Sequence, residues 1–166
     1  MLLFVKNLLF TVLVPGTVAV FVPLFVLDHA AAEISVGALA GGLLVLIGAT
    51  IYFWCLWDFA TVGRGTPAPN DPPKHLVIRG LYRHTRNPMY VGVLCVIAGW
   101  ALFFQAQPFA IYWLCTATFF HLFVVLYEEP HLKLIFGPTY EEYCAQVGRW
   151  LPFRKQRAAV SGRGDR

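Results

Sequence analysis

The sequence has few charged residues: Asp, Glu, Lys and Arg make up 13% of its 166 residues, while 58% are hydrophobic. A water-soluble domain carries about 25% charged residues. So small a charged fraction cannot cover the surface of a globule in water. The shortage excludes an ordinary soluble domain and predicts a single domain that partly faces lipid.

Cysteine is also scarce, with four residues and no C-x-x-C pair. Three of the four lie in apolar runs, where Cys behaves as a small hydrophobic residue. No His stands at ligand spacing from them. The pattern therefore predicts no disulfide framework and no metal site.

Long apolar runs are what the sequence does contain, at residues 8–27, 36–57, 89–104 and 109–127. The first run has 20 residues without a charge, and at about 1.5 Å per residue it spans ~30 Å of hydrocarbon. A cleaved signal peptide is the alternative, but its apolar core is only about 7–15 residues long. We expect Pro15 and Pro23 to kink this helix. In the second run, Gly37 and Gly41 have the spacing that lets helices approach closely in lipid, as do Ala38 and Gly42.

These runs predict an all-α polytopic membrane protein with about four transmembrane helices. A short polar turn at residues 105–108 makes the last two a helical hairpin, ending at Glu128-Glu129-Pro130. Residues 58–87 are basic and proline-rich and cannot span a bilayer. Residues 139–147 have apolar positions at helical spacing, which predicts a C-terminal amphipathic helix on the membrane surface, with Thr139 and Glu142 as a capping box. We assign 1–152 to one domain, with a motif-bearing half at 79–152, and predict a disordered basic tail at 153–166.

The basic residues predict the topology. All 13 Lys and Arg lie in the N-terminus, the central segment or the C-terminal tail, and none lies in 28–35 or 105–108. Because cytoplasmic segments carry the excess of Lys and Arg, both termini and the central segment are expected on the cytoplasmic side.

Polar groups able to do chemistry gather at that side. The central segment ends in a run from residue 79 to 92 that contains Asn87-Pro-Met-Tyr90, and the hairpin brings it near Glu128 and Glu129. The basic tail returns there with Arg149. Paired carboxylates at a helix C-terminus oppose the helix dipole, so they need a cationic partner or a bound cation. The alternative is that they only reach headgroup water beside Arg83 or Arg86.

Two further side chains suggest a site. His121 lies two turns before Glu128 inside an apolar run, where an ionisable residue is a functional hypothesis; the alternative is a neutral His hydrogen-bonded to a neighbouring helix. Pro88 is expected to start the third helix. Tyr90 would then face the same pocket as Asn87.

Four motifs carry a family resemblance: residues 80–92, Tyr127-Glu-Glu-Pro130, residues 136–143 and Arg149-Trp-Leu-Pro152. Together they resemble the isoprenylcysteine carboxyl methyltransferases and the related phospholipid N-methyltransferases. The resemblance covers residues 79–152, and the first two helices carry no distinguishing motif. Asn87 stands where the carboxyl methyltransferases typically have His, whereas the phospholipid enzymes often read Asn-Pro-Met-Tyr.

The resemblance implies S-adenosylmethionine as methyl donor, held at the cytoplasmic face. Cofactor contacts are expected from Tyr82, Arg83, Asn87, Tyr90, Glu128, Glu129, Tyr140 and Arg149. The catalytic candidates are Glu128, Glu129, Arg149 and His121, since an amine acceptor would need a base while a carboxylate would not.

We therefore expect a membrane methyltransferase acting on a lipophilic acceptor of the isoprenylcysteine type that enters from the bilayer. A phospholipid amine is the alternative acceptor, and no nucleic-acid partner is expected. Two other interpretations remain open. A nicotinamide-dependent membrane reductase has similar C-terminal motifs but more helices. A dimeric four-helix transporter would place ionisable groups near the bilayer midplane, where only His121 qualifies.

Overall fold

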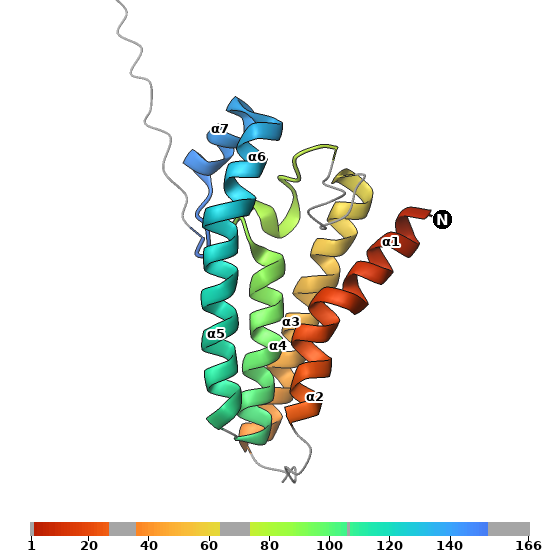
Figure 1. The fold of residues 1–166 in the computed structure, drawn as a ribbon, viewed down its shortest axis with the longest axis vertical. Helices are drawn as coiled ribbons and strands as arrows, with labels where there is room; N and C mark the ends of the chain where they lie inside the picture. The colour runs from red at the N-terminus through yellow and green to blue at the C-terminus, as the bar shows by residue number, and fades with distance from the viewer. Residues whose placement is uncertain (1, 27–35, 64–73, 106, 153–166) are drawn as a thin grey trace, which may run out of the picture.

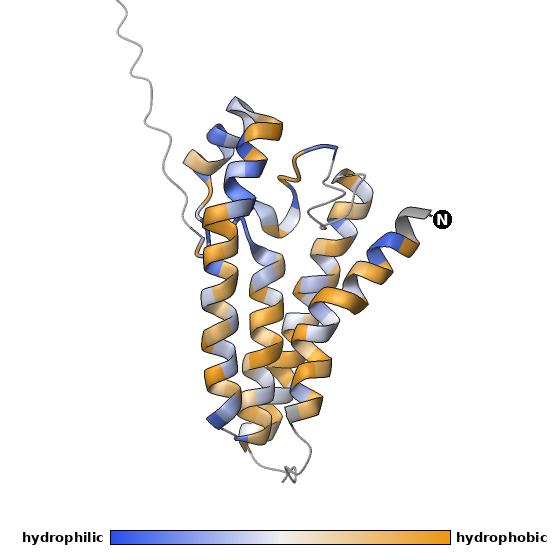
Figure 2. Cartoon of the chain, in the orientation of Figure 1, coloured by the Kyte–Doolittle hydropathy of each residue, from blue (hydrophilic) through white to orange (hydrophobic). Residues whose placement is uncertain are grey.

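The computed structural model describes residues 2–26, 36–63, 74–105 and 107–152, and these residues form helices and connecting segments (Figure 1). Three helical segments are long and apolar enough to cross a membrane: Val5–Phe25, Val36–Gly63 and Gln107–Phe136. A shorter apolar helix, α4 (Pro88–Phe104), lies among them. The predicted all-α polytopic membrane fold is confirmed. Figure 2 shows hydrophobic residues along the long helices and hydrophilic residues gathered at the end of the bundle that carries α6 and α7.

The N-terminal segment is one bent helix made of α1 (Leu2–Thr11), η1 (Val12–Phe21) and α2 (Val22–Val26). Its middle is a π-helix that contains Pro15, and the Val22 amide bonds the Thr17 carbonyl five residues back. Proline lacks an amide hydrogen and its ring clashes with the carbonyl four residues earlier, so a wider turn relieves the clash. Figure 1 shows α1 leaning away from the other helices beyond this segment.

Helix α3 (Val36–Asp58), continued by η2 (Phe59–Gly63), packs antiparallel to α4 through paired glycines. A Cβ on Gly48 would lie 2.5 Å from the Gly92 carbonyl oxygen, and a Cβ on Gly99 would lie 2.7 Å from the Gly41 carbonyl oxygen. The two backbones therefore touch directly, which is how small residues stabilise helix pairs in lipid. Gly41 belongs to this contact as its spacing suggested, whereas Gly42 has open space around it.

The last apolar helix is longer than the sequence suggested. α5 (Gln107–Phe123) continues through a π turn, η4 (Val124–Glu128), into α6 (Glu129–Phe136). The expectation that the helix ends at Glu128–Pro130 is wrong, because the Glu129 amide bonds the Val124 carbonyl and the wider turn accommodates Pro130. The two carboxylates thus lie inside a helix. The hairpin of α4 and α5 is confirmed, with Gln105 in the left-handed conformation at its turn (φ 49°).

The helix expected near residue 139 is α7 (Pro138–Gln146). It begins after Gly137, whose φ is 53°, and no side-chain cap forms, so the capping box at Thr139 is wrong. Its apolar residues Tyr140 and Tyr143 are buried against the protein rather than laid on lipid. The tail at 153–166 lies outside the described residues.

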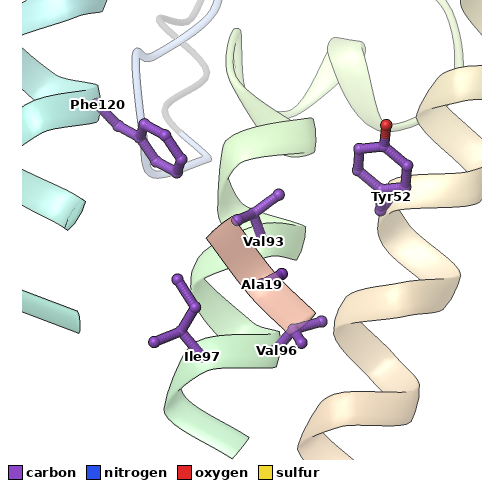
Figure 3. Packing of buried hydrophobic residues seen from close by; sticks show 6 residues of the cluster. All are labelled: Ala19, Tyr52, Val93, Val96, Ile97 and Phe120. Atoms are coloured by element: carbon purple, nitrogen blue, oxygen red, sulfur yellow. The ribbon is translucent and has the colours of Figure 1, made fainter. Parts of the chain in front are cut away.

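A core cluster joins all four apolar segments. It contains Ala19, Tyr52, Val93, Val96, Ile97 and Phe120 (Figure 3). Its residues come from η1, α3, α4 and α5, so the N-terminal segment is an integral wall of the bundle.

Candidate active site

A cavity of about 350 Å³ lies between the apolar helices, below η3 (Gly80–Arg83), α6 and α7. This volume falls within the ~300–1,000 Å³ of small-molecule sites. Its polar and charged lining residues come from α3, η3, the segment before α4, α4, η4, α6 and α7: Tyr52, Tyr82, Arg86, Asn87, Tyr90, Tyr127, Glu128, Glu129, His131, Tyr140 and Tyr143.

The opposite part of the cavity is apolar. It is lined by side chains of the N-terminal segment and of α5: Phe10, Val14, Pro15, Val18, Phe119, Phe120 and Phe123. One cavity therefore joins a charged end, beside α6 and α7, to a hydrocarbon end between two membrane-crossing helices. A cavity of this kind fits two ligands bound side by side, one polar and the other apolar.

Glu129 is held by two arginines at the charged end. Arg149 donates Nε to Oε1 at 2.7 Å and Nη2 to Oε2 at 2.9 Å. Arg86 Nη1 lies 3.1 Å from the same Oε1. The fork geometry makes a strong charge-assisted pair. Its hydrogen bond raises the pKa of Arg149 further.

Glu128 has a different environment. Its Oε2 accepts a hydrogen bond of 2.7 Å from the Tyr90 hydroxyl. Within the described ranges no Lys, Arg or His forms an ion pair with it. Both carboxylates line the cavity, but Glu129 is paired with two arginines, whereas Glu128 is paired with the Tyr90 hydroxyl. A cationic group on a ligand would supply the missing partner.

Hydrogen bonds between the segment before α4 and the segment after α7 explain how Arg149 reaches this site. Residues 85 and 148 form an isolated parallel bridge, and the Arg86 amide donates to the Gly148 carbonyl at 2.9 Å. The Arg149 carbonyl accepts from Thr85 Oγ1 at 2.9 Å and from Asn87 Nδ2 at 3.1 Å. Asn87 thus ties the chain after α7 to the start of α4 instead of capping α4.

Three buried tyrosines close the cavity toward η3 and α7. The Tyr143 hydroxyl donates to the Tyr82 carbonyl at 2.6 Å, which joins α7 to η3. Burial raises the pKa of Tyr82, Tyr140 and Tyr143 above the usual value. These phenols therefore stay protonated even where an exposed tyrosine begins to lose its proton, at about pH 10.

Most of the residues predicted from sequence meet here. Tyr82, Asn87, Tyr90, Glu128, Glu129 and Tyr140 line the one cavity, and Arg149 adjoins it through Glu129. Two do not lie on its lining: Arg83 is exposed, and His121 is exposed with its Nδ1 accepting from Trp150 Nε1 at 3.1 Å. The roles of all these residues remain predictions.

Sequence reasoning misses several lining residues. It places Arg86 only as a neighbour of the acids, and Tyr143 only on an apolar face. It assigns the N-terminal segment no role, because a uniformly apolar run has no periodicity to show which face looks inward. Tyr52 in α3 also lines the cavity; a signal was present, since a polar side chain inside an apolar run is a candidate for function.

The described residues therefore form an all-helical membrane bundle whose cavity has a carboxylate pair at one end and an apolar wall at the other. The family model for phospholipid methyltransferases matches residues 36–139, well over half of the chain. The chain belongs to this family, within the integral membrane methyltransferases. No match was found among curated proteins or among solved structures.

Proposed function

We propose that this protein transfers a methyl group from S-adenosylmethionine to a lipophilic acceptor that enters from the bilayer. The observation that carries the proposal is the single cavity that joins Glu128, Glu129 and Arg86 to the apolar wall between the N-terminal segment and α5. Membership of the phospholipid methyltransferase family supports the reaction type.

The residues fit this cofactor. Its ammonium matches Glu128, the carboxylate that lacks a cationic partner among the described residues. Its carboxylate matches Arg86, whose buried Nε has no hydrogen-bond partner within the same part of the chain. The rings of Tyr90 and Tyr140 line the cavity and offer faces to adenine or to the sulfonium.

When bound, the cofactor supplies a sulfonium methyl group, and the electrons of the broken carbon–sulfur bond remain on sulfur. The chain's own contribution is to hold the acceptor in line and to keep water out, and such positioning can supply much of the rate. An amine acceptor becomes a cation as the new bond forms and must release a proton. Glu128, supported by the Tyr90 hydroxyl, can receive that proton.

We propose two candidate acceptors. An isoprenylcysteine-type carboxylate is implied by the resemblance of the motifs. A phospholipid amine is the second candidate, and it is supported by the match of residues 36–139 to the family model for phospholipid methyltransferases. The bias of Lys and Arg toward the end that carries α6 and α7 supports a cytoplasmic position for the site.

Calorimetry of S-adenosylhomocysteine binding to purified protein in detergent tests the proposal. We expect Glu128→Gln and Glu129→Gln to weaken binding more than tenfold, because hydrogen bonds to charged groups are worth about 1.5–3 kcal/mol. Glu142→Gln, on the exposed side of α7, is the matched control. Wild-type protein that binds NADPH instead would favour a reductase. Proton-coupled transport that His121→Ala abolishes would favour a transporter, and either result would refute the proposal.

A further inference from the structure

The cavity wall opposite Glu128 also carries a polar side chain, that of Tyr52. Tyr52 of α3 is 6% exposed and lines the cavity, and its hydroxyl lies 3.0 Å from Thr11 Oγ1 of α1. Figure 3 shows its ring projecting from α3 and Phe120 projecting from α5 on the other side of α4. The Tyr52 hydroxyl points toward the Val93 end of α4, which is the end nearer Tyr90.

The direction of the Tyr52–Thr11 bond follows from counting protons. Thr11 has one hydroxyl proton, and it is donated to the Asn7 carbonyl at 2.8 Å. Four other helical threonines bond the carbonyl four residues earlier in the same way, at 2.7–2.9 Å: Thr17, Thr50, Thr61 and Thr118. Tyr52 must therefore be the donor to Thr11. Its oxygen then offers only lone pairs to the cavity.

Counting hydroxyl protons gives the same result for Tyr90, on the opposite wall of the cavity. The Tyr90 proton goes to Glu128 at 2.7 Å, which leaves the Tyr90 oxygen and the carboxylate as acceptors. Three residues from different helices thus line the cavity with hydrogen-bond acceptors, namely the oxygens of Tyr52, Tyr90 and Glu128. A carboxylate placed against these three oxygens would meet lone pairs there and would have to find its hydrogen bonds elsewhere on the lining, for instance at Arg86. A group with N–H or O–H bonds would satisfy them.

We propose that Tyr52, oriented by Thr11, is a specificity-determining residue that accepts a hydrogen bond from the polar end of the methyl acceptor. The site would then take a lipid whose polar end carries N–H or O–H bonds. This inference rests on the proposed function. Tyr52 lies within the residues 36–139 that the family model matches, and Thr11 lies in the N-terminal segment before them.

An interhelical tyrosine bond can also be purely structural, and the chain supplies a matched control. The Tyr112 hydroxyl of α5 donates to the Val18 carbonyl of the same N-terminal segment at 2.8 Å, and Tyr112 is not among the residues that line the cavity. Tyr52→Phe and Tyr112→Phe each remove one tyrosine bond to that segment. Only Tyr52→Phe removes an oxygen from the cavity.

The experiment measures transfer of labelled methyl groups to phosphatidylethanolamine vesicles and to N-acetyl-S-farnesylcysteine in micelles. Both variants are expected to lower the midpoint of thermal unfolding. Tyr52→Phe should also raise KM for the amine lipid about 3- to 10-fold, the effect of one neutral hydrogen bond. Its KM for S-adenosylmethionine and its affinity for S-adenosylhomocysteine should stay as in wild type.

Thr11→Val provides a second measurement, because it keeps the Tyr52 oxygen and frees its proton to act as a donor. Thr11→Val should therefore reduce the ratio of kcat/KM for the amine lipid to kcat/KM for the farnesylcysteine. Equal acceptor KM for Tyr52→Phe and Tyr112→Phe, or wild-type methylation of the farnesylcysteine alone, would overturn the inference while leaving the methyltransferase intact. Wild type that neither binds S-adenosylhomocysteine nor transfers methyl groups would refute the proposed function itself.

Discussion

Gly48 lies where α3 and α4 touch, and replacing it with Ala tests whether this contact positions the cavity walls. The added Cβ would lie 2.5 Å from the Gly92 carbonyl oxygen and 2.8 Å from the Val96 amide nitrogen. Both atoms belong to backbone, so neither can swing aside. The helices must separate by about 1 Å to restore ordinary contact.

The destabilisation caused by the steric overlap can be compared with the stabilisation gained from the higher helix propensity of Ala. Overpacking of this kind costs about 1–3 kcal/mol, and Ala instead of Gly in a helix returns about 0.5–1 kcal/mol. The net effect spans about 0–2.5 kcal/mol, and we expect Gly48→Ala to lower the free energy of unfolding by about 1 kcal/mol, near the middle of that range. Gly42→Ala, with nothing within 4 Å of its added Cβ, should raise the free energy of unfolding by about 0.5–1 kcal/mol.

Unfolding in mixed micelles, followed by circular dichroism, compares these variants with Gly41→Ala. Gly41 makes the same kind of backbone contact with Gly99 and Phe103, farther from the charged end of the cavity. Both contact variants should be destabilised, but only Gly48→Ala should raise KM for the amine lipid, because Tyr52 lies one turn beyond Gly48. A Gly48→Ala protein as stable as Gly42→Ala would refute the reasoning.

Three further outcomes are expected. Arg149→Lys should retain part of the affinity for the cofactor, because Lys keeps the charge but not the two parallel hydrogen bonds to Glu129. Arg149→Ala should bind the cofactor about tenfold more weakly than Arg149→Lys. Equal dissociation constants of the two variants in calorimetry would contradict this. Tyr143→Phe should lower the unfolding midpoint by removing the bond to the Tyr82 carbonyl, whereas an unchanged midpoint would count against that bond. Because burial raises the pKa of Tyr140 and Tyr143, the unfolded chain loses those protons first. Stability should therefore fall as pH rises above about 10, and a flat midpoint from pH 9 to 11 would contradict the burial.

Much of the fold could be predicted because lipid restricts the choices. A long apolar run must satisfy its backbone internally, so it must be a helix. The runs that form α3 and α4 are placed within a residue or two by the sequence. The end of the last helix is misplaced because Pro130 usually stops a helix, and a π turn that absorbs a proline leaves no mark in composition.

The candidate site could be predicted in part for a similar reason. Glu128, Asn87 and Tyr90 stand out as polar groups at the ends of apolar runs, so sequence alone could gather them. Tyr52 and Thr11 are 41 residues apart in different helices. Nothing local to either indicates that their hydroxyls meet.

The sequence by itself determined that the chain lies in a membrane, how its helices are spaced and which end carries charge, because hydropathy and charge act residue by residue. Tertiary structure alone decided which carboxylate is paired with arginines and which with a tyrosine hydroxyl. Glu128 and Glu129 are chemically identical neighbours, and only the packing of Arg86 and Arg149 against Glu129, and of Tyr90 against Glu128, makes them different.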